Sequence, residues 1–168
     1  FSYTENGFGR GLPPRPDNES KWGYMRPLLA NPALDPEPAD IRTARSQANT
    51  LLEIRQSTPL FHLGSARLVQ QKVSFGNGGP DQTPGVIVMR IDDTVGRDVD
   101  PRLKGLIVVF NARPDATTQT MPGTAGQRFV LHPVQAKGAD AVVKGSAYDR
   151  RTGTFTVPGR TVAVFVQR

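Results

Sequence analysis

The stretch RTVAVFVQ, residues 160–167, decides the fold class of this chain. It is a nearly continuous run of β-branched and aromatic residues, which is typical of a buried β-strand. Side chains alternate along a strand, so its three valines face one way while Ala163 and Phe165 face the other. The segment therefore predicts a strand at this position.

Segments of similar character precede this strand at short intervals. Two of them are apolar runs expected for strands buried on both faces, and the others mix apolar residues with turn residues. The predicted strands are residues 67–75, 86–91, 106–110, 127–133 and 153–159. In the first, Val69, Val73 and Phe75 fall on one side. Residues 76–85, GNGGPDQTPG, predict a loop rich in turns. Short strands separated by Gly/Pro turns predict an antiparallel β-sandwich.

Helical patterns occur before the strands. The clearest predicted helix is residues 38–57, because Pro38 suits a first helical turn and Asp40 places negative charge at the positive end of the helix dipole. Thr58-Pro59 ends it, since a residue before proline leaves the helical region. Residues 20–31 predict a shorter helix, which Pro27 interrupts or kinks. We therefore expect one or two helices ahead of the sandwich.

The two patterns divide the chain into residues 1–60 and 61–168. The first part is irregular or helical and cannot bury its apolar face alone, whereas the second reads as a self-sufficient β domain. A length of 168 residues suits one domain or one domain plus a piece of another. The chain starts at Phe1 rather than Met, so we expect it to be part of a longer protein.

Composition limits the function classes. The 21 Lys and Arg against 15 Asp and Glu give a net charge of +6, but the basic residues are scattered and only Arg150 and Arg151 are adjacent. We therefore expect a solvated basic surface and no nucleic acid partner. The absence of cysteine excludes disulfides, cysteine zinc sites and thiol nucleophiles. No apolar run approaches the roughly 18 residues of a membrane span.

The loop DDTVGRDVDPRL, residues 92–103, concentrates acidic side chains. Spaced carboxylates are able to bind Ca²⁺, but the spacing is not that of an EF-hand and arginines lie among the acids. We therefore favour a solvated hairpin loop, with a calcium site or a catalytic carboxylate pair as alternatives. The acids are Asp92, Asp93, Asp98 and Asp100.

The two histidines, His62 and His132, have neither metal-ligand nor catalytic-triad spacing. We interpret both as structural or surface histidines rather than ligands or bases. Trp22 is able to stack on a sugar ring, but we favour its packing against structure outside this chain.

The stretch ENGFGRGLPPRP, residues 5–16, is rich in glycine. A phosphate-binding loop needs a strand before it and a helix after it, and neither is predicted here. We therefore interpret the glycines as turn-forming. Tyr3 precedes the glycines and Phe8 lies between two of them, and both are able either to pack or to stack on sugar rings.

Six segments taken together resemble one enzyme family, the bacterial pullulanase-type α-1,6-glucosidases. These are debranching enzymes of glycoside hydrolase family 13, and plant limit dextrinases are similar. The resemblance runs in order along essentially the whole chain, and its most specific piece lies in LLEIRQSTPLFHLG. The six segments are NGFGRGLPP (6–14), MRPLLANPAL (25–34), LLEIRQSTPLFHLG (51–64), VSFGNGGPDQTPGVIVMRIDD (73–93), LKGLIVVFNA (103–112) and VPGRTVAVFVQ (157–167).

The resemblance implies a (β/α)₈ catalytic barrel followed by an all-β C-terminal domain, with the helix at 38–57 as the last barrel helix. It implies hydrolysis of α-1,6 branch links in α-glucans such as pullulan and limit dextrins, by a nucleophilic Asp and a general-acid Glu with retention. No position here matches the motifs that carry those carboxylates. We therefore assign no catalytic residue and expect this chain to be supporting and inactive by itself.

The resemblance also implies partners for particular residues. The rim of the substrate cleft would include Tyr3, Asn6, Phe8 and Arg10. The barrel would pack on Leu51, Leu52, Ile54, Leu60 and Phe61. No metal or cofactor is implied for this chain, and calcium in the longer protein is not assignable here. Two alternatives stay open: a stand-alone carbohydrate-binding β-sandwich, which needs an exposed row of aromatics, and a basic interaction module.

Overall fold

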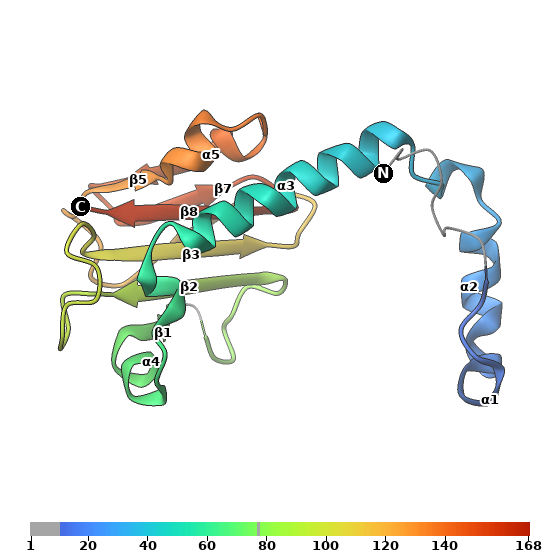
Figure 1. Cartoon of the computed structure of the whole chain (residues 1–168), viewed down its shortest axis with the longest axis horizontal. Helices are drawn as coiled ribbons and strands as arrows, with labels where there is room; N and C mark the ends of the chain where they lie inside the picture. Colours follow the sequence, from blue (N-terminus) through green and yellow to red (C-terminus); the bar gives the residue numbers. More distant parts are fainter. Residues whose placement is uncertain (1–10, 77) are drawn as a thin grey trace. The chain divides into compact units, whose positions relative to one another are not determined.

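The computed structural model describes residues 11–76 and 78–168 (Figure 1). The chain divides into two compact units, residues 1–49 and 50–168, and the boundary falls inside helix α3. Within the described part of the chain, no helix combines the length and apolar character needed to cross a membrane.

The first unit contains short helices. Trp22 is half-buried there: its indole N–H donates to the carbonyl of Pro13 at 3.0 Å, and the Arg26 guanidinium lies 5.5 Å from its ring centroid. This contact occupies one face of the ring. Both predicted helices are present, as α2 and α3, and Pro27 lies inside α2. The elements are α1 (Arg15–Asn18), η1 (Glu19–Lys21), α2 (Trp22–Leu29), η2 (Pro32–Leu34) and the start of α3 (Pro38–Gln56).

The second unit is an antiparallel β-sandwich, as the sequence predicted. A five-stranded sheet has the order β1-β2-β3-β8-β5 and a three-stranded sheet the order β4-β7-β6. The strands are β1 (Val73–Phe75), β2 (Val86–Asp92), β3 (Gly105–Asn111), β4 (Thr117–Thr120), β5 (Phe129–Leu131), β6 (Ala147–Asp149), β7 (Thr154–Val157) and β8 (Thr161–Gln167). Its helices are η3 (Pro59–His62), α4 (Ala66–Lys72), α5 (Pro133–Lys137) and η4 (Val143–Gly145).

One predicted strand is wrong. Residues 67–75 were expected to be extended throughout, but the chain forms α4 up to Lys72 and only then enters β1. The cause is local: the Ser65 hydroxyl accepts a hydrogen bond from the backbone N–H of Leu68 at 3.3 Å and caps the helix.

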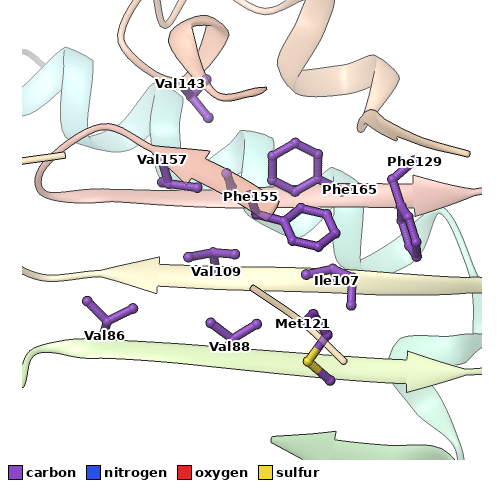
Figure 2. Packing of buried hydrophobic residues seen from close by; sticks show 11 residues of the cluster. Val86, Val88, Ile107, Val109, Met121, Phe129, Val143, Phe155, Val157 and Phe165 are labelled. Carbon is purple, nitrogen blue, oxygen red and sulfur yellow. The ribbon is translucent and has the colours of Figure 1, made fainter. Parts of the chain in front are cut away.

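The first hydrophobic core lies between the two sheets (Figure 2). Phe155 is fully buried, and its ring centroid lies 4.7 Å from that of Tyr148, 5.0 Å from Phe165 and 5.5 Å from Phe129. The sandwich therefore uses most of its aromatic side chains as core. The buried members are Val86, Val88, Ile107, Val109, Met121, Phe129, Val143, Phe155, Val157, Ala163 and Phe165.

The second core lies on the opposite face of the five-stranded sheet, where the end of α3 and η3 cover it. Ile54 and Leu60 are 2% and 1% exposed there. Their expected contact with a barrel is therefore wrong, because the chain's own sheet surrounds them, and Phe61 also packs against this core. Leu51 and Leu52 remain 40% and 54% exposed. The buried members are Ile54, Leu60, Ile91, Leu106, Val108, Val164 and Val166.

Candidate functional site

The four residues predicted for a substrate rim lie outside the part of the chain that the structure describes. They are Tyr3, Asn6, Phe8 and Arg10. A cluster of polar side chains, several of them buried, lies instead where the end of α3 meets the five-stranded sheet. We call it the α3 junction, and it consists of Ser57, Thr58, Lys72, Asp93, Asp100, Arg102 and His132.

Asp100 is the centre of the α3 junction and is 1% exposed. It accepts hydrogen bonds from the Thr58 hydroxyl at 2.7 Å and from the Arg102 Nε and Nη2 atoms at 2.8 Å each. The bonds from Arg102, followed by the one from Thr58, hold the pKa of Asp100 far below its usual range although burial opposes this. The bidentate contact with Arg102 lies within the loop between β2 and β3, and the hydrogen bond from Thr58 joins this loop to the chain that follows α3.

Arg102 also reaches α3 itself. Its Nη2 atom donates to the carbonyl of Ser57, the residue after α3, at 3.0 Å. Carbonyl groups at the end of a helix have no partner within the helix, so a guanidinium there both satisfies one and complements the helix dipole. Arg102 therefore stabilises the end of α3, which Thr58 and Pro59 terminate.

The ion pair between Lys72 and Asp93 is the most buried polar contact of the α3 junction. The Lys72 Nζ and Asp93 Oδ1 atoms are 2.8 Å apart, and the two side chains are 0% and 1% exposed. Lys72 also donates to the carbonyl of Val95 at 2.6 Å, while Asp93 accepts from the backbone N–H groups of Val99 and Asp100. Burial raises the pKa of Asp93, but these hydrogen bonds outweigh it and hold the pKa below its usual range.

The prediction of a solvated loop is thus wrong at two of its four acids. Asp93 and Asp100 are buried because Lys72 and Arg102 neutralise them, whereas Asp98 is exposed. In the described residues, no three His, Asp or Glu side chains gather as a metal site would require. The sequence reasoning missed Lys72, and the Ser65 cap was the signal that would have placed it on a helix.

His132 ties a second segment to α3. Its Nδ1 atom accepts from the backbone N–H of Val134 at 3.2 Å, so the proton of the neutral ring is on Nε2. That Nε2–H faces the Ser57 hydroxyl at 3.1 Å, and the hydroxyl donates to the carbonyl of Ile54 at 2.7 Å. The serine proton therefore points away from the histidine, and the pair is not a nucleophile with its base.

The segment around His132 is held against β8 by a side-chain amide. Gln135, on α5, donates to the carbonyl of Val162 at 2.7 Å and accepts from the N–H of Val164 at 2.9 Å. The amide thus replaces a neighbouring strand at this part of β8. His132 is buried and His62 is exposed.

An open groove of about 450 Å³ borders the α3 junction. Its walls combine polar and charged side chains with apolar ones. The lining residues are Ser57, Arg102, Leu103, His132, Pro133, Val166 and Arg168.

The substitution His132→Gln should flatten the dependence of stability on pH between about pH 6.5 and 5. Burial, followed by the charge of Arg168, lowers the pKa of His132. As the pH falls below about 6.5, the unfolded chain therefore binds a proton before the folded chain does. The free energy of unfolding then decreases until the pH reaches the pKa of His132 in the folded chain. Thermal unfolding midpoints from pH 8 to 5 measure this, with His62→Gln as the control that should keep the parent slope. Equal slopes in both variants would refute the assignment.

Comparisons of this chain with known proteins identify its family. Residues 3–168 match the family described as "Alpha-1,6-glucosidases, pullulanase-type, C-terminal". The chain belongs to this family. Pullulanase 1, chloroplastic, of Arabidopsis thaliana is 42% identical over 99% of this chain, which covers 18% of that protein. The pullulanase of Klebsiella pneumoniae is 31% identical over 98% of this chain, which covers 15% of it.

Solved structures of pullulanases are also similar to this chain. The crystal structure of PulA from Klebsiella oxytoca matches with a TM-score of 0.78 and 31% identity, over 94% of this chain and 15% of that one. PulA of Klebsiella pneumoniae in complex with maltotriose matches with a TM-score of 0.77 and 30% identity, over 94% of this chain and 17% of that one. The pullulanase-type resemblance predicted from the sequence is therefore confirmed, and the chain spans less than a fifth of these relatives.

Proposed function

We propose that this chain is the supporting C-terminal region of a longer enzyme that hydrolyses α-1,6 branch links in α-glucans. The observation that carries the proposal is the alignment of nearly the whole chain with proteins named pullulanase, of which it covers 15–18%. A maltotriose complex of one such relative supports an α-glucan as the substrate class.

In the longer protein, residues 1–60 are the end of a (β/α)₈ barrel and residues 61–168 the C-terminal β domain. The barrel packs on the outer side of α3, where Leu51 and Leu52 are 40% and 54% exposed. Burying a leucine side chain fully stabilises a contact by roughly 1.5–3 kcal/mol, so these two contribute a substantial contact. The α3 junction holds the end of α3 on the sheet while the barrel holds its exposed side.

On this proposal, the residues that catalyse glycoside hydrolysis lie outside this chain. Retaining glycosidases place a nucleophilic carboxylate and a general acid about 5–5.5 Å apart across the scissile bond. The acids with the most interactions here, Asp93 and Asp100, are each neutralised by a cation of this chain. Their role is structural, and the catalytic Asp and Glu belong to the barrel.

The test compares two purified proteins: the 168-residue chain and the longer protein that carries it. We expect the longer protein to release reducing sugar from pullulan and the chain alone to release none above a blank without protein. An α-1,4-linked glucan without branches serves as the control substrate. Pullulan turnover by the chain alone, or none by the longer protein, would contradict the proposal.

A further inference from the structure

Basic side chains that are far apart in the sequence meet at one end of the five-stranded sheet. Lys104 comes directly before β3, Arg128 directly before β5 and Arg168 directly after β8. These three strands are neighbours in the sheet, with β8 in the middle and antiparallel to both others. The three residues therefore lie at the same end of the sheet, where Figure 1 marks the C-terminus.

The strand register places these three cations in one row. Gln167, the last residue of β8, is paired with the first residue of β3 and with the first residue of β5. The N–H of Lys104 donates to the carbonyl of Gln167 at 2.8 Å, so the ladder continues to the next position. There Arg168 lies between Lys104 and Arg128. Because neighbouring strands are about 4.8 Å apart and paired side chains share a face, the three Cβ atoms lie within about 10 Å.

A pair of hydrogen bonds brings two more arginines close to this row. The Arg150 Nε atom donates to the carbonyl of Gly126 at 2.7 Å, and the N–H of Gly126 donates to the carbonyl of Arg150 at 2.7 Å. Gly126 lies two residues before Arg128, so the turn between β6 and β7 is held beside the start of β5. We call the resulting group of five the basic end, and its members are Lys104, Arg128, Arg150, Arg151 and Arg168.

The basic end has few carboxylates to neutralise it. All five side chains are exposed, and within residues 11–76 and 78–168 none of them takes part in an ion pair. In the loop before β3, Asp93 and Asp100 are already paired with other cations, which leaves Asp98 and Asp149 as the exposed acids nearby. Like charges directly opposite each other on a sheet are destabilising, so the row costs the fold free energy unless an anion neutralises it.

The row also borders the groove beside the α3 junction. Arg168 lines that groove, and its positive charge, after burial, is a cause of the lowered pKa of His132 in the same wall. A hollow with an unpaired cation in its wall admits a small anionic group and holds it by charge.

We propose that the basic end binds phosphate monoesters carried by an α-glucan. Four of its five residues are arginines, whose planar guanidinium groups form bidentate hydrogen bonds with phosphate. A phosphate monoester carries about −1.5 to −2 charges at pH 7, so one such group neutralises more than one member of the row. The choice of carrier rests on the proposed function, which brings α-glucans to the protein, whereas the binding of phosphate does not.

Other polyanions fit the basic end less well. Proteins that bind single-stranded nucleic acid stack its bases on aromatic side chains, and the basic end contains none. The centre of an interface with another protein is depleted of charged residues, whereas the basic end consists of them. A phosphate group on a sugar requires neither an aromatic platform nor an apolar centre.

Isothermal titration calorimetry of the 168-residue chain tests the proposal. The ligands are amylopectin that carries phosphate esters and the same amylopectin after treatment with a phosphatase. We expect the phosphorylated form to bind roughly tenfold or more tightly, and to bind more weakly as NaCl is raised, because salt screens exposed charges. Equal affinities for the two forms would overturn the proposal. Binding of inorganic phosphate or of polyglutamate as tight as that of the phosphorylated glucan would overturn it in favour of the free ion or of an acidic protein segment.

A triple substitution removes the row while leaving the buried contacts intact. Lys104→Gln, Arg128→Gln and Arg168→Gln in one chain should weaken binding of the phosphorylated glucan roughly tenfold, because the charge-assisted bonds to phosphate are lost. Urea unfolding checks that this variant folds, and its midpoint should be unchanged or higher because like-charge repulsion is removed.

The control removes three exposed charges elsewhere, at Lys137→Gln, Lys144→Gln and Arg160→Asn. Arg160 directly precedes β8 and so lies at the opposite end of that strand from Arg168, and asparagine tolerates its φ of 51°. This variant should keep the parent affinity, and an equal loss in it would reduce the effect to net charge and overturn the proposal. In the longer protein the row variant should hydrolyse pullulan, which carries no phosphate, at the parent rate. Failure of phosphate binding is thereby distinguished from failure of the proposed function.

Discussion

Replacing Asp93 with alanine is expected to lower the free energy of unfolding by about 3–5 kcal/mol. The substitution leaves the Lys72 ammonium buried without its counter-ion, since the two side chains are 0% and 1% exposed. It also removes the acceptor of the backbone N–H groups of Val99 and Asp100. An unpaired buried charge costs more than the pair contributes, so the loss exceeds that of an ordinary hydrogen bond.

Urea unfolding followed by far-UV circular dichroism at pH 7 measures this change. Asp98→Ala is the control, because Asp98 lies in the same loop but is exposed, and it should change the unfolding free energy by less than about 0.5 kcal/mol. Adding Lys72→Met to Asp93→Ala removes the stranded charge and should recover part of the loss. Similar losses for Asp93→Ala and Asp98→Ala would show that the pair does not support the fold.

Much of the sandwich was predictable because its long strands are apolar on both faces. The runs in β2, β3 and β8 are covered by a core on each side of the five-stranded sheet, and a continuous apolar run indicates this directly. The predicted orientation of the β8 side chains is also confirmed. Ala163 and Phe165 belong to the first core, and Val164 and Val166 belong to the second. These predictions are confirmed because such a strand meets a core on each of its faces.

In the second sheet, β7 was predicted within residues 153–159, whereas the two edge strands β4 and β6 were not. β4 is the polar sequence TTQT and β6 has three residues, so neither gives an apolar run. Only one face of this sheet meets the core, and its outer face carries pairs such as Thr118 and Thr156, whose hydroxyl oxygens are 3.1 Å apart. A strand with one solvated face and so few residues has too little pattern to be separated from a loop.

The α3 junction was beyond sequence reasoning for a different reason. Thr58 and Asp100 are 42 residues apart, and Ser57 and His132 are 75 residues apart, so no local spacing indicates their contact. The loop acids were predicted to be solvated because their ion pairs with Lys72 and Arg102 form only in the folded chain. Arg102 lies two residues from Asp100 and was visible, but its second contact, with the end of α3, depends on the folded topology.

Replacing Phe155 with alanine is expected to destabilise the sandwich by about 3–5 kcal/mol. The side chain is fully buried between the two sheets, and three aromatic rings surround it. Truncation therefore leaves a cavity lined by groups that cannot close it, because Phe165 is fixed in the middle of the five-stranded sheet and Tyr148 on the edge strand β6. The lost edge-to-face contacts add to the transfer free energy.

Phe75→Ala is the matched control, because it makes the same chemical change at a ring that is 58% exposed. Chemical unfolding of the 168-residue chain should give a loss of about 1 kcal/mol or less for Phe75→Ala, since little area returns to water. A loss for Phe155→Ala as small as that for Phe75→Ala would mean that the ring cluster does not hold the two sheets together.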